Sequence, residues 1–236
     1  MKTTPDFLIT AAAAAGAVVA GGAAYALLEY PPCASLGATR AERDAALPGD
    51  DLIPDGLRST RAITIQAPPE AIWPWLVQMG QDRGGFYSHD WLERLFGAEI
   101  RNADCIHPEW QALAVGDMMW PYPERKLRAM AKSSSDIGGW KVASIKAEQS
   151  LVVQSNAGRW TWSLVLERTD GGGTRLVVRT RFAKPEHALS RAIDALVGQP
   201  AHLVMEVGVL RGIKSRAEAH VLASSAQTVV TGAPWV

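Results

Sequence analysis

The sequence predicts an α+β domain in which an antiparallel sheet is covered on one face by a long C-terminal helix. Residues 138–182 contain four segments typical of strands, separated by short turns. The last two of these alternate apolar and polar residues, which indicates a sheet with one buried and one solvated face. Residues 200–223 then carry apolar side chains at helical spacing, and this helix is expected to cover the buried face.

The amino-acid composition favours some classes of function over others. The 236 residues contain 24 basic and 24 acidic side chains, so the basic excess typical of a nucleic-acid partner is missing. Nine tryptophans suit a core, but they also suit the walls of a cavity for an apolar ligand. The two cysteines, Cys33 and Cys105, are too few for a disulfide framework or a four-cysteine metal site. No cofactor is expected.

The N-terminal segment, within residues 1–30, is interpreted as a membrane anchor. Phe7–Leu28 is a run of about 22 residues without a charge, long enough to cross a bilayer. The alternative is a cleaved signal peptide, with Lys2 as the charged start and Ala24–Ala26 as the cleavage site. The short basic tail favours a domain outside the cytoplasm. Residues 31–58, rich in proline and glycine, are interpreted as a linker or a loosely draped arm.

The folded domain is expected over residues 59–223, followed by a loose tail at 224–236. Residues 61–67 alternate and predict a strand, with Ile63 and Ile65 on one face. A helix is expected over 69–80, where Pro74 should split or kink it. A second short helix is expected to begin after Ser88, its N-cap, and to end just before Gly97.

Strands dominate the next part of the chain. They are predicted over residues 116–120, 126–131, 138–145, 150–155, 159–167 and 174–182. Residues 168–173, rich in glycine, predict a hairpin turn between the last two. The long helix follows from Pro200, and the residues Gly198 to Pro200 are expected to separate it from a shorter helix.

Four stretches carry a resemblance to a known family. They read APPEAIWPWLVQMG, RGGFYSHDWLE, ADCIHPEWQALAVGD and MEVGVLRGIKSRAE, in this order. The chain resembles the SRPBCC or START-like superfamily, which includes polyketide cyclases and lipid-transport domains, and within it a membrane-associated bacterial branch. The resemblance implies a helix-grip fold, in which a curved sheet wraps around the long helix and leaves an apolar cavity. The chain departs from the branch in MEVGVL, where relatives often carry basic residues after the glutamate.

The polar residues allow two interpretations. His89, Asp90 and His107 are candidates for acid–base chemistry. However, Asp90 would also complement the dipole of the helix that Ser88 caps, and a polar loop often only supports the scaffold. Asp104, Cys105, His107 and Glu109 lack the one-turn spacing of helical zinc ligands, so no metal site is predicted. His187, His202 and His220 are expected at the surface or at helix caps.

The aromatic residues favour a binding function. Tyr87, Trp91, Trp140, Trp160, Trp162 and Met205 are predicted to line the ligand space. Flat rings and thioethers adapt to irregular apolar ligands, although each residue could equally belong to an ordinary core. The first hypothesis is therefore a membrane-anchored domain that binds a lipid-like or polycyclic small molecule. The alternatives are a cyclase or dehydratase-like enzyme that uses His89, Asp90 or His107, and a structural domain with a filled core. The ligand and the oligomeric state are not assigned.

Overall fold

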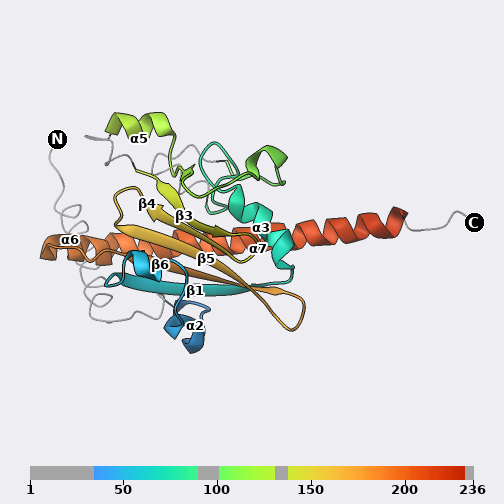
Figure 1. The fold of residues 1–236 in the computed structure, drawn as a ribbon, viewed down its shortest axis with the longest axis horizontal. Coiled ribbons are helices and arrows are strands. Elements are labelled where there is room, and N and C mark those ends of the chain that lie inside the picture. Colours follow the sequence, from blue (N-terminus) through green and yellow to red (C-terminus); the bar gives the residue numbers. More distant parts are fainter. Residues whose placement is uncertain (1–34, 90–100, 131–137, 232–236) are drawn as a thin grey trace, which may run out of the picture.

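The computed structural model describes residues 35–89, 101–130 and 138–231. Six antiparallel strands form one sheet in the order β1-β6-β5-β4-β3-β2, and the long helix α7 (Gln199–Thr231) packs along one face (Figure 1). The strands are β1 (Leu57–Ile65), β2 (Met118–Met119), β3 (Trp140–Lys146), β4 (Ser150–Ser155), β5 (Trp160–Arg168) and β6 (Thr174–Phe182). The α+β class is confirmed, and the arrangement is helix-grip-like.

Strands β5 and β6 pair as predicted. Trp160 lies opposite Phe182, and Leu164 lies opposite Val178. The turn between β5 and β6 closes with a hydrogen bond from the Thr169 amide to the Gly173 carbonyl, and Gly172 has φ +77°. Glycine reaches this left-handed conformation without a Cβ clash, so the glycine-rich turn suits the hairpin.

The helices differ from the predictions at several places. α3 (Pro69–Val77) continues through Pro74 without being split. Residues 126–131 were predicted to be a strand, and this is wrong, because α5 (Glu124–Met130) occupies them. The carbonyl of Pro123 accepts from the amides of Lys126 and Leu127, and the Arg128 side chain donates to Glu124 one turn away. These local contacts favour helix over strand here. The helix predicted after Ser88 lies outside the described residues from Asp90 onwards.

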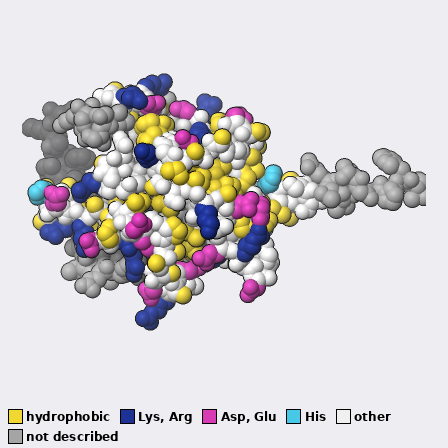
Figure 2. Space-filling view, in the orientation of Figure 1, with side chains coloured by type: hydrophobic (Ala, Val, Ile, Leu, Met, Phe, Trp, Pro, Cys, Tyr) yellow, Lys and Arg dark blue, Asp and Glu magenta, His cyan; other side chains and the backbone are white. Residues whose placement is uncertain are grey.

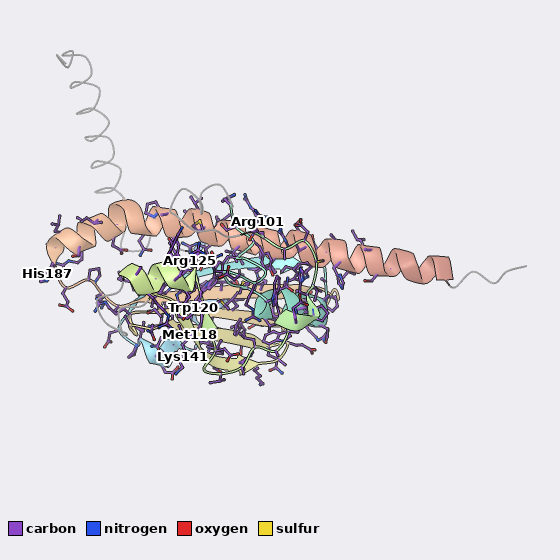
Figure 3. The ribbon with its side chains drawn as sticks, turned by 90° about the horizontal axis from the view of Figure 1, so that it is seen from above. Arg101, Met118, Trp120, Arg125, Lys141 and His187 are labelled. Atoms are coloured by element: carbon purple, nitrogen blue, oxygen red, sulfur yellow. The ribbon has the colours of Figure 1, made fainter. Side chains whose placement is uncertain are left out.

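The terminal helix runs without the predicted separation. α6 (Ala188–Ile193), the π-helical turn η5 (Asp194–Gly198) and α7 follow one another directly. Pro200 cannot donate a backbone hydrogen bond, and the π turn precedes it where the normal ladder would be interrupted. Glu206, Val209, Ile213 and Ala217 form the buried face of α7. Figure 3 shows α7 lying along the whole sheet, with His187 at the start of α6.

The opposite face of the sheet was predicted to be solvated, but residues 35–56 cover it. This segment contains the short helix α2 (Arg40–Asp44), visible below β1 in Figure 1, and the 3-10 turn η2 (Asp50–Leu52). Arg179 of β6 is only 1% exposed and donates to the carbonyl oxygens of Glu42, Arg43 and Ala45 and to Asp50. The segment is therefore part of the folded unit, not a loose arm.

Two further arginines of β6 bind the same segment. Arg175 donates to both carboxylate oxygens of Glu42, at 2.6 and 3.0 Å. Arg181 donates to Asp50 and to the carbonyl oxygens of Ile53 and Pro54. Because three of the four outward positions of β6 are arginine, with Val177 as the fourth, the outer face presents a row of donors to the carbonyl and carboxylate oxygens of residues 37–54.

The distribution of charged side chains on the surface agrees with the equal numbers of basic and acidic residues in the sequence. Figure 2 shows basic and acidic side chains interspersed over the visible face, with apolar side chains between them. Among the residues that the structure describes, no helix combines the length and the apolar character needed to cross a bilayer. The proposed anchor, Phe7–Leu28, lies outside these residues.

Candidate functional site

Six rings meet beneath one end of the sheet, at the start of α7, and we call them the aromatic cluster. Its members are Phe86, Trp140, Trp160, Trp162, Phe182 and His202. Trp160 is central, with its ring centroid 4.8 Å from that of Trp140 and 5.2 Å from that of Phe182. Phe86 contacts Trp140 edge-on at 5.5 Å. The edge-to-face and stacked geometries are those that aromatic pairs prefer.

Strand alternation explains how the cluster assembles. Trp160 and Trp162 are two residues apart on β5, so both side chains point to the face covered by α7. Phe182 lies directly opposite Trp160 on β6, and Trp140 begins β3 two strands away. The structure thus brings together three of the residues predicted to line a ligand space: Trp140, Trp160 and Trp162.

A buried charge lies beside the aromatic cluster. The carboxylate of Glu206, on α7, pairs with the guanidinium of Arg61, on β1, and both side chains are almost fully buried, with exposures of 2% and 1%. The other carboxylate oxygen accepts from Trp162 Nε1 at 3.1 Å and from Thr180 Oγ1 at 2.7 Å. Both carboxylate oxygens therefore have partners, which such a buried charge requires.

The sequence analysis did not select this pair, although part of the signal was present. The alternation that puts Ile63 and Ile65 on one face also places Arg61 on that face. Glu206 lies two turns before Ile213 on the buried side of α7. What the pattern does not contain is the pairing, because the two residues are 145 positions apart.

His202 joins the aromatic cluster to the charged pair. It was expected at the surface or at a helix cap, and this is wrong, because it lies within α7 with its ring packed between Trp160, at 5.6 Å, and Phe182, at 5.1 Å. Burial lowers the pKa of His202, while the nearby Glu206 carboxylate acts in the opposite direction. Its Nε2 lies 3.7 Å from Glu206 Oε1. His187 and His220 are exposed.

Two ring nitrogens of the cluster have no hydrogen-bond partner. His202 Nδ1 and Trp160 Nε1 are both buried, and neither forms a hydrogen bond within the described part of the chain. Most buried polar atoms in proteins are hydrogen-bonded, so each exception needs an explanation. These two belong to rings in contact with each other.

Tyr87, also predicted to line the ligand space, packs further along α7. Its hydroxyl donates to the Trp75 carbonyl at 3.0 Å, its ring meets that of Trp75 edge-on, and Arg216 lies 5.0 Å above it. Burial raises the pKa of Tyr87, so the phenol remains a donor. Its backbone rests on Gly212 of α7, where a Cβ would overlap the Tyr87 carbonyl oxygen. Tyr87 therefore attaches the loop at residues 87–89 to α7.

The other candidates in this loop have different positions. Ser88 donates to the Met205 carbonyl at 3.1 Å, which places Met205 beside the loop. His89 is exposed and lies next to Gly208 of α7. Asp90 and Trp91 lie outside the described residues, so their predicted roles stay predictions. The glycines at 208 and 212 thus let the loop at 87–89 approach the helix backbone closely.

His107 belongs to a separate group of residues. Its Nε2 lies 3.4 Å from Cys105 Sγ and its Nδ1 lies 3.2 Å from Glu109 Oε1, while its ring contacts that of Trp110 at a tilt of 33°. None of the ring contacts among the described residues joins this group to the aromatic cluster. The structure therefore does not unite His89 and His107 in one site. Within the described ranges, no group of three or more His, Cys, Asp or Glu side chains is arranged to hold a metal ion.

Comparison with known proteins gives likeness of fold only. No family model and no curated protein matches the sequence. A polyketide-cyclase-like protein from Corynebacterium glutamicum is 13% identical, with a TM-score of 0.41, and the match covers 72% of this chain and 96% of that one. The Aha1 dimer from Colwellia psychrerythraea is 13% identical, with a TM-score of 0.35 over 67% of this chain and 96% of that one. An AHSA1-like protein from Aeromonas hydrophila is 17% identical, with a TM-score of 0.37 over 70% and 95%.

Proposed function

We propose that this domain binds a hydrophobic small molecule, lipid-like or polycyclic, at the aromatic cluster between the sheet and α7. Trp140, Trp160, Phe182 and His202 are only partly buried, so rings at this end of the sheet remain within reach of a ligand. Flat aromatic walls with a few polar groups are typical of sites for such ligands.

The observation that carries this proposal is the pair of unsatisfied ring nitrogens. With the Nε2 of His202 directed at a carboxylate, its Nδ1 would be an acceptor, whereas the indole N–H of Trp160 is a donor. A hydroxyl group can donate to the first or accept from the second. The site therefore suits an apolar molecule that carries a hydroxyl group.

The proposal is tested by displacement of the fluorescent probe N-phenyl-1-naphthylamine from the purified full-length protein. Two competitors are compared, a polycyclic hydrocarbon and its monohydroxylated derivative. Trp160→Phe keeps a ring and removes the N–H, so it should weaken the hydroxylated competitor about 5- to 10-fold and leave the hydrocarbon nearly unchanged. Trp110→Phe, outside the cluster, is the control and should change neither. A wild-type protein that binds no probe, or a Trp160→Phe that affects both competitors equally, would contradict the proposal.

We further propose that Phe7–Leu28 anchors the domain in a membrane, with the domain outside the cytoplasm. The length and the missing charges of this segment support the anchor. The first described residue is residue 35, and a chain from residue 28 to residue 35 can span at most about 25 Å. After carbonate extraction the full-length protein should stay in the membrane pellet. Recovery of a soluble form that begins near Leu27 would support cleavage of a signal peptide.

A further inference from the structure

Cys105, His107 and Glu109 lie in line at the surface, away from the aromatic cluster. The thiol sulfur is 3.4 Å from His107 Nε2, and His107 Nδ1 is 3.2 Å from a carboxylate oxygen of Glu109. The thiol is exposed, and the His107 side chain is one-third exposed. A reagent in solution can therefore reach the sulfur.

The order of these three groups is that of an activated nucleophile. A thiol acts as a nucleophile after it loses its proton, and a neighbouring imidazole is the usual base. The carboxylate of Glu109 accepts from Nδ1–H, which would leave the lone pair of Nε2 directed at the thiol. A backbone amide and His107 hydrogen-bond to Glu109 and lower its pKa, so this group stays ionised.

The loop that carries the three residues is held by buried contacts. Gln78, fully buried at the end of α3, donates from its amide to the Cys105 carbonyl and accepts from the His107 backbone N–H, both at 3.1 Å. Gln111 donates to the His107 carbonyl at 3.1 Å. The ring of Trp110 contacts that of His107 in a tilted arrangement, with 4.1 Å between the centroids. Both the backbone around His107 and its imidazole are thus oriented, as a positioned base requires.

We propose that Cys105 is a nucleophile that accepts the acyl group of a carboxylic ester, with His107 as its base and Glu109 as a positioning residue. The thiol proton passes to His107 Nε2, and the thiolate attacks the carbonyl carbon. The carbon–oxygen bond to the leaving group then breaks, and the alkoxide takes the proton from His107. One ester and one thiol give one thioester and one alcohol, without oxidation or reduction. A base that can return its proton favours an oxygen ester, because an alkoxide leaves poorly without one.

The test uses p-nitrophenyl butyrate with the full-length protein in detergent. We expect a burst of p-nitrophenolate equal to one acyl group per chain, with the butyryl group located on Cys105 by peptide mass spectrometry. Cys105→Ser should abolish the burst. Cys33→Ser, which changes the other cysteine, is the matched control and should keep it.

The relay itself is tested through the acylation rate. His107→Gln should lower this rate by about 100-fold. Glu109→Gln should lower the rate less, and Glu109→Asp should restore part of the lost rate. These substitutions leave the backbone contacts of Gln78 in place.

Two results would overturn the proposal. One is a wild-type Cys105 that reacts no faster than glutathione at the same pH, which decides the question even if a variant fails to fold. The other is a butyryl group found on Cys33 or on a lysine. Because the reaction is independent of the aromatic cluster, its failure would leave the proposed ligand binding untouched.

Discussion

Arg61 of β1 and Glu206 of α7 form a buried ion pair that joins the first strand of the sheet to the last helix. Trp162 and Thr180 complete the coordination of the carboxylate. Removing two charges from water costs several kcal/mol for each ion, which the attraction and the hydrogen bonds only roughly offset. The pair is therefore expected to contribute little net stability while making each partner dependent on the other.

Glu206→Gln should destabilise the domain by about 3–5 kcal/mol, because it leaves the Arg61 charge buried without a counter-ion. Arg61→Met and Glu206→Leu are compared singly and together. The double variant should lose much less stability than the sum of the losses in these two single variants. Urea unfolding of the full-length protein in detergent, followed by tryptophan fluorescence, measures both. Arg168→Gln, which breaks the exposed pair with Glu70, is the control and should stay within about 1 kcal/mol. Additive single changes would show that the two residues are not coupled.

The stability of the domain should fall as the pH drops below about 6.5, the ordinary pKa of histidine. Burial lowers the pKa of His202, so the unfolded chain binds a proton at a higher pH than the folded one. Stability is then complete above the unfolded pKa and decreases as the pH falls towards the folded pKa, by up to about 1.4 kcal/mol per pH unit. His202→Gln should flatten this part of the unfolding free-energy profile. His220→Gln, at an exposed position, should not; an unchanged slope in His202→Gln would assign the dependence to other groups.

Arg179→Lys should release residues 38–54 from the outer face of the sheet. Lysine keeps the charge but cannot match the forked donors that reach four oxygen atoms of this segment. Loss of about 1–3 kcal/mol should raise amide hydrogen exchange in residues 41–53 about 10- to 100-fold. Arg168→Lys, on the exposed end of β5, serves as the matched control. Equal protection of these amides in Arg179→Lys and Arg168→Lys would mean that residues 38–54 are held in place without the guanidinium of Arg179.

Gly212→Ala should destabilise the domain by about 1–3 kcal/mol, although alanine favours helices over glycine. The added Cβ would overlap the carbonyl oxygen of Tyr87, a backbone atom that cannot turn aside. Thermal unfolding measures the change. Gly171→Ala is the control, because nothing lies within 4 Å of a Cβ there and its φ is not positive. A stabilised Gly212→Ala would indicate that the loop moves away from α7 at little cost.

Several elements could be predicted because their signal is local and periodic. The alternation in residues 159–167 and 174–182 predicts two strands, and the glycines between them predict their turn. Trp160 and Trp162 could be placed on one buried face for the same reason. Residues 126–131 show the limit of this method, since a short mixed segment carries no clear period and its helix is supported by local contacts to Pro123 and Glu124.

The sequence by itself determined the α+β class, the β5–β6 hairpin and the covering helix, because each follows from repeats of two or 3.6 residues. The tertiary structure alone decided that Arg61 meets Glu206, that His202 is packed between Trp160 and Phe182, and that Arg179 is covered by residues 42–50. Periodicity states which face a residue occupies, but not which distant residue lies opposite. From sequence alone, a charged side chain is therefore assigned to the solvent-exposed surface. It can be buried only where the fold provides a partner whose hydrogen bonds replace those of water.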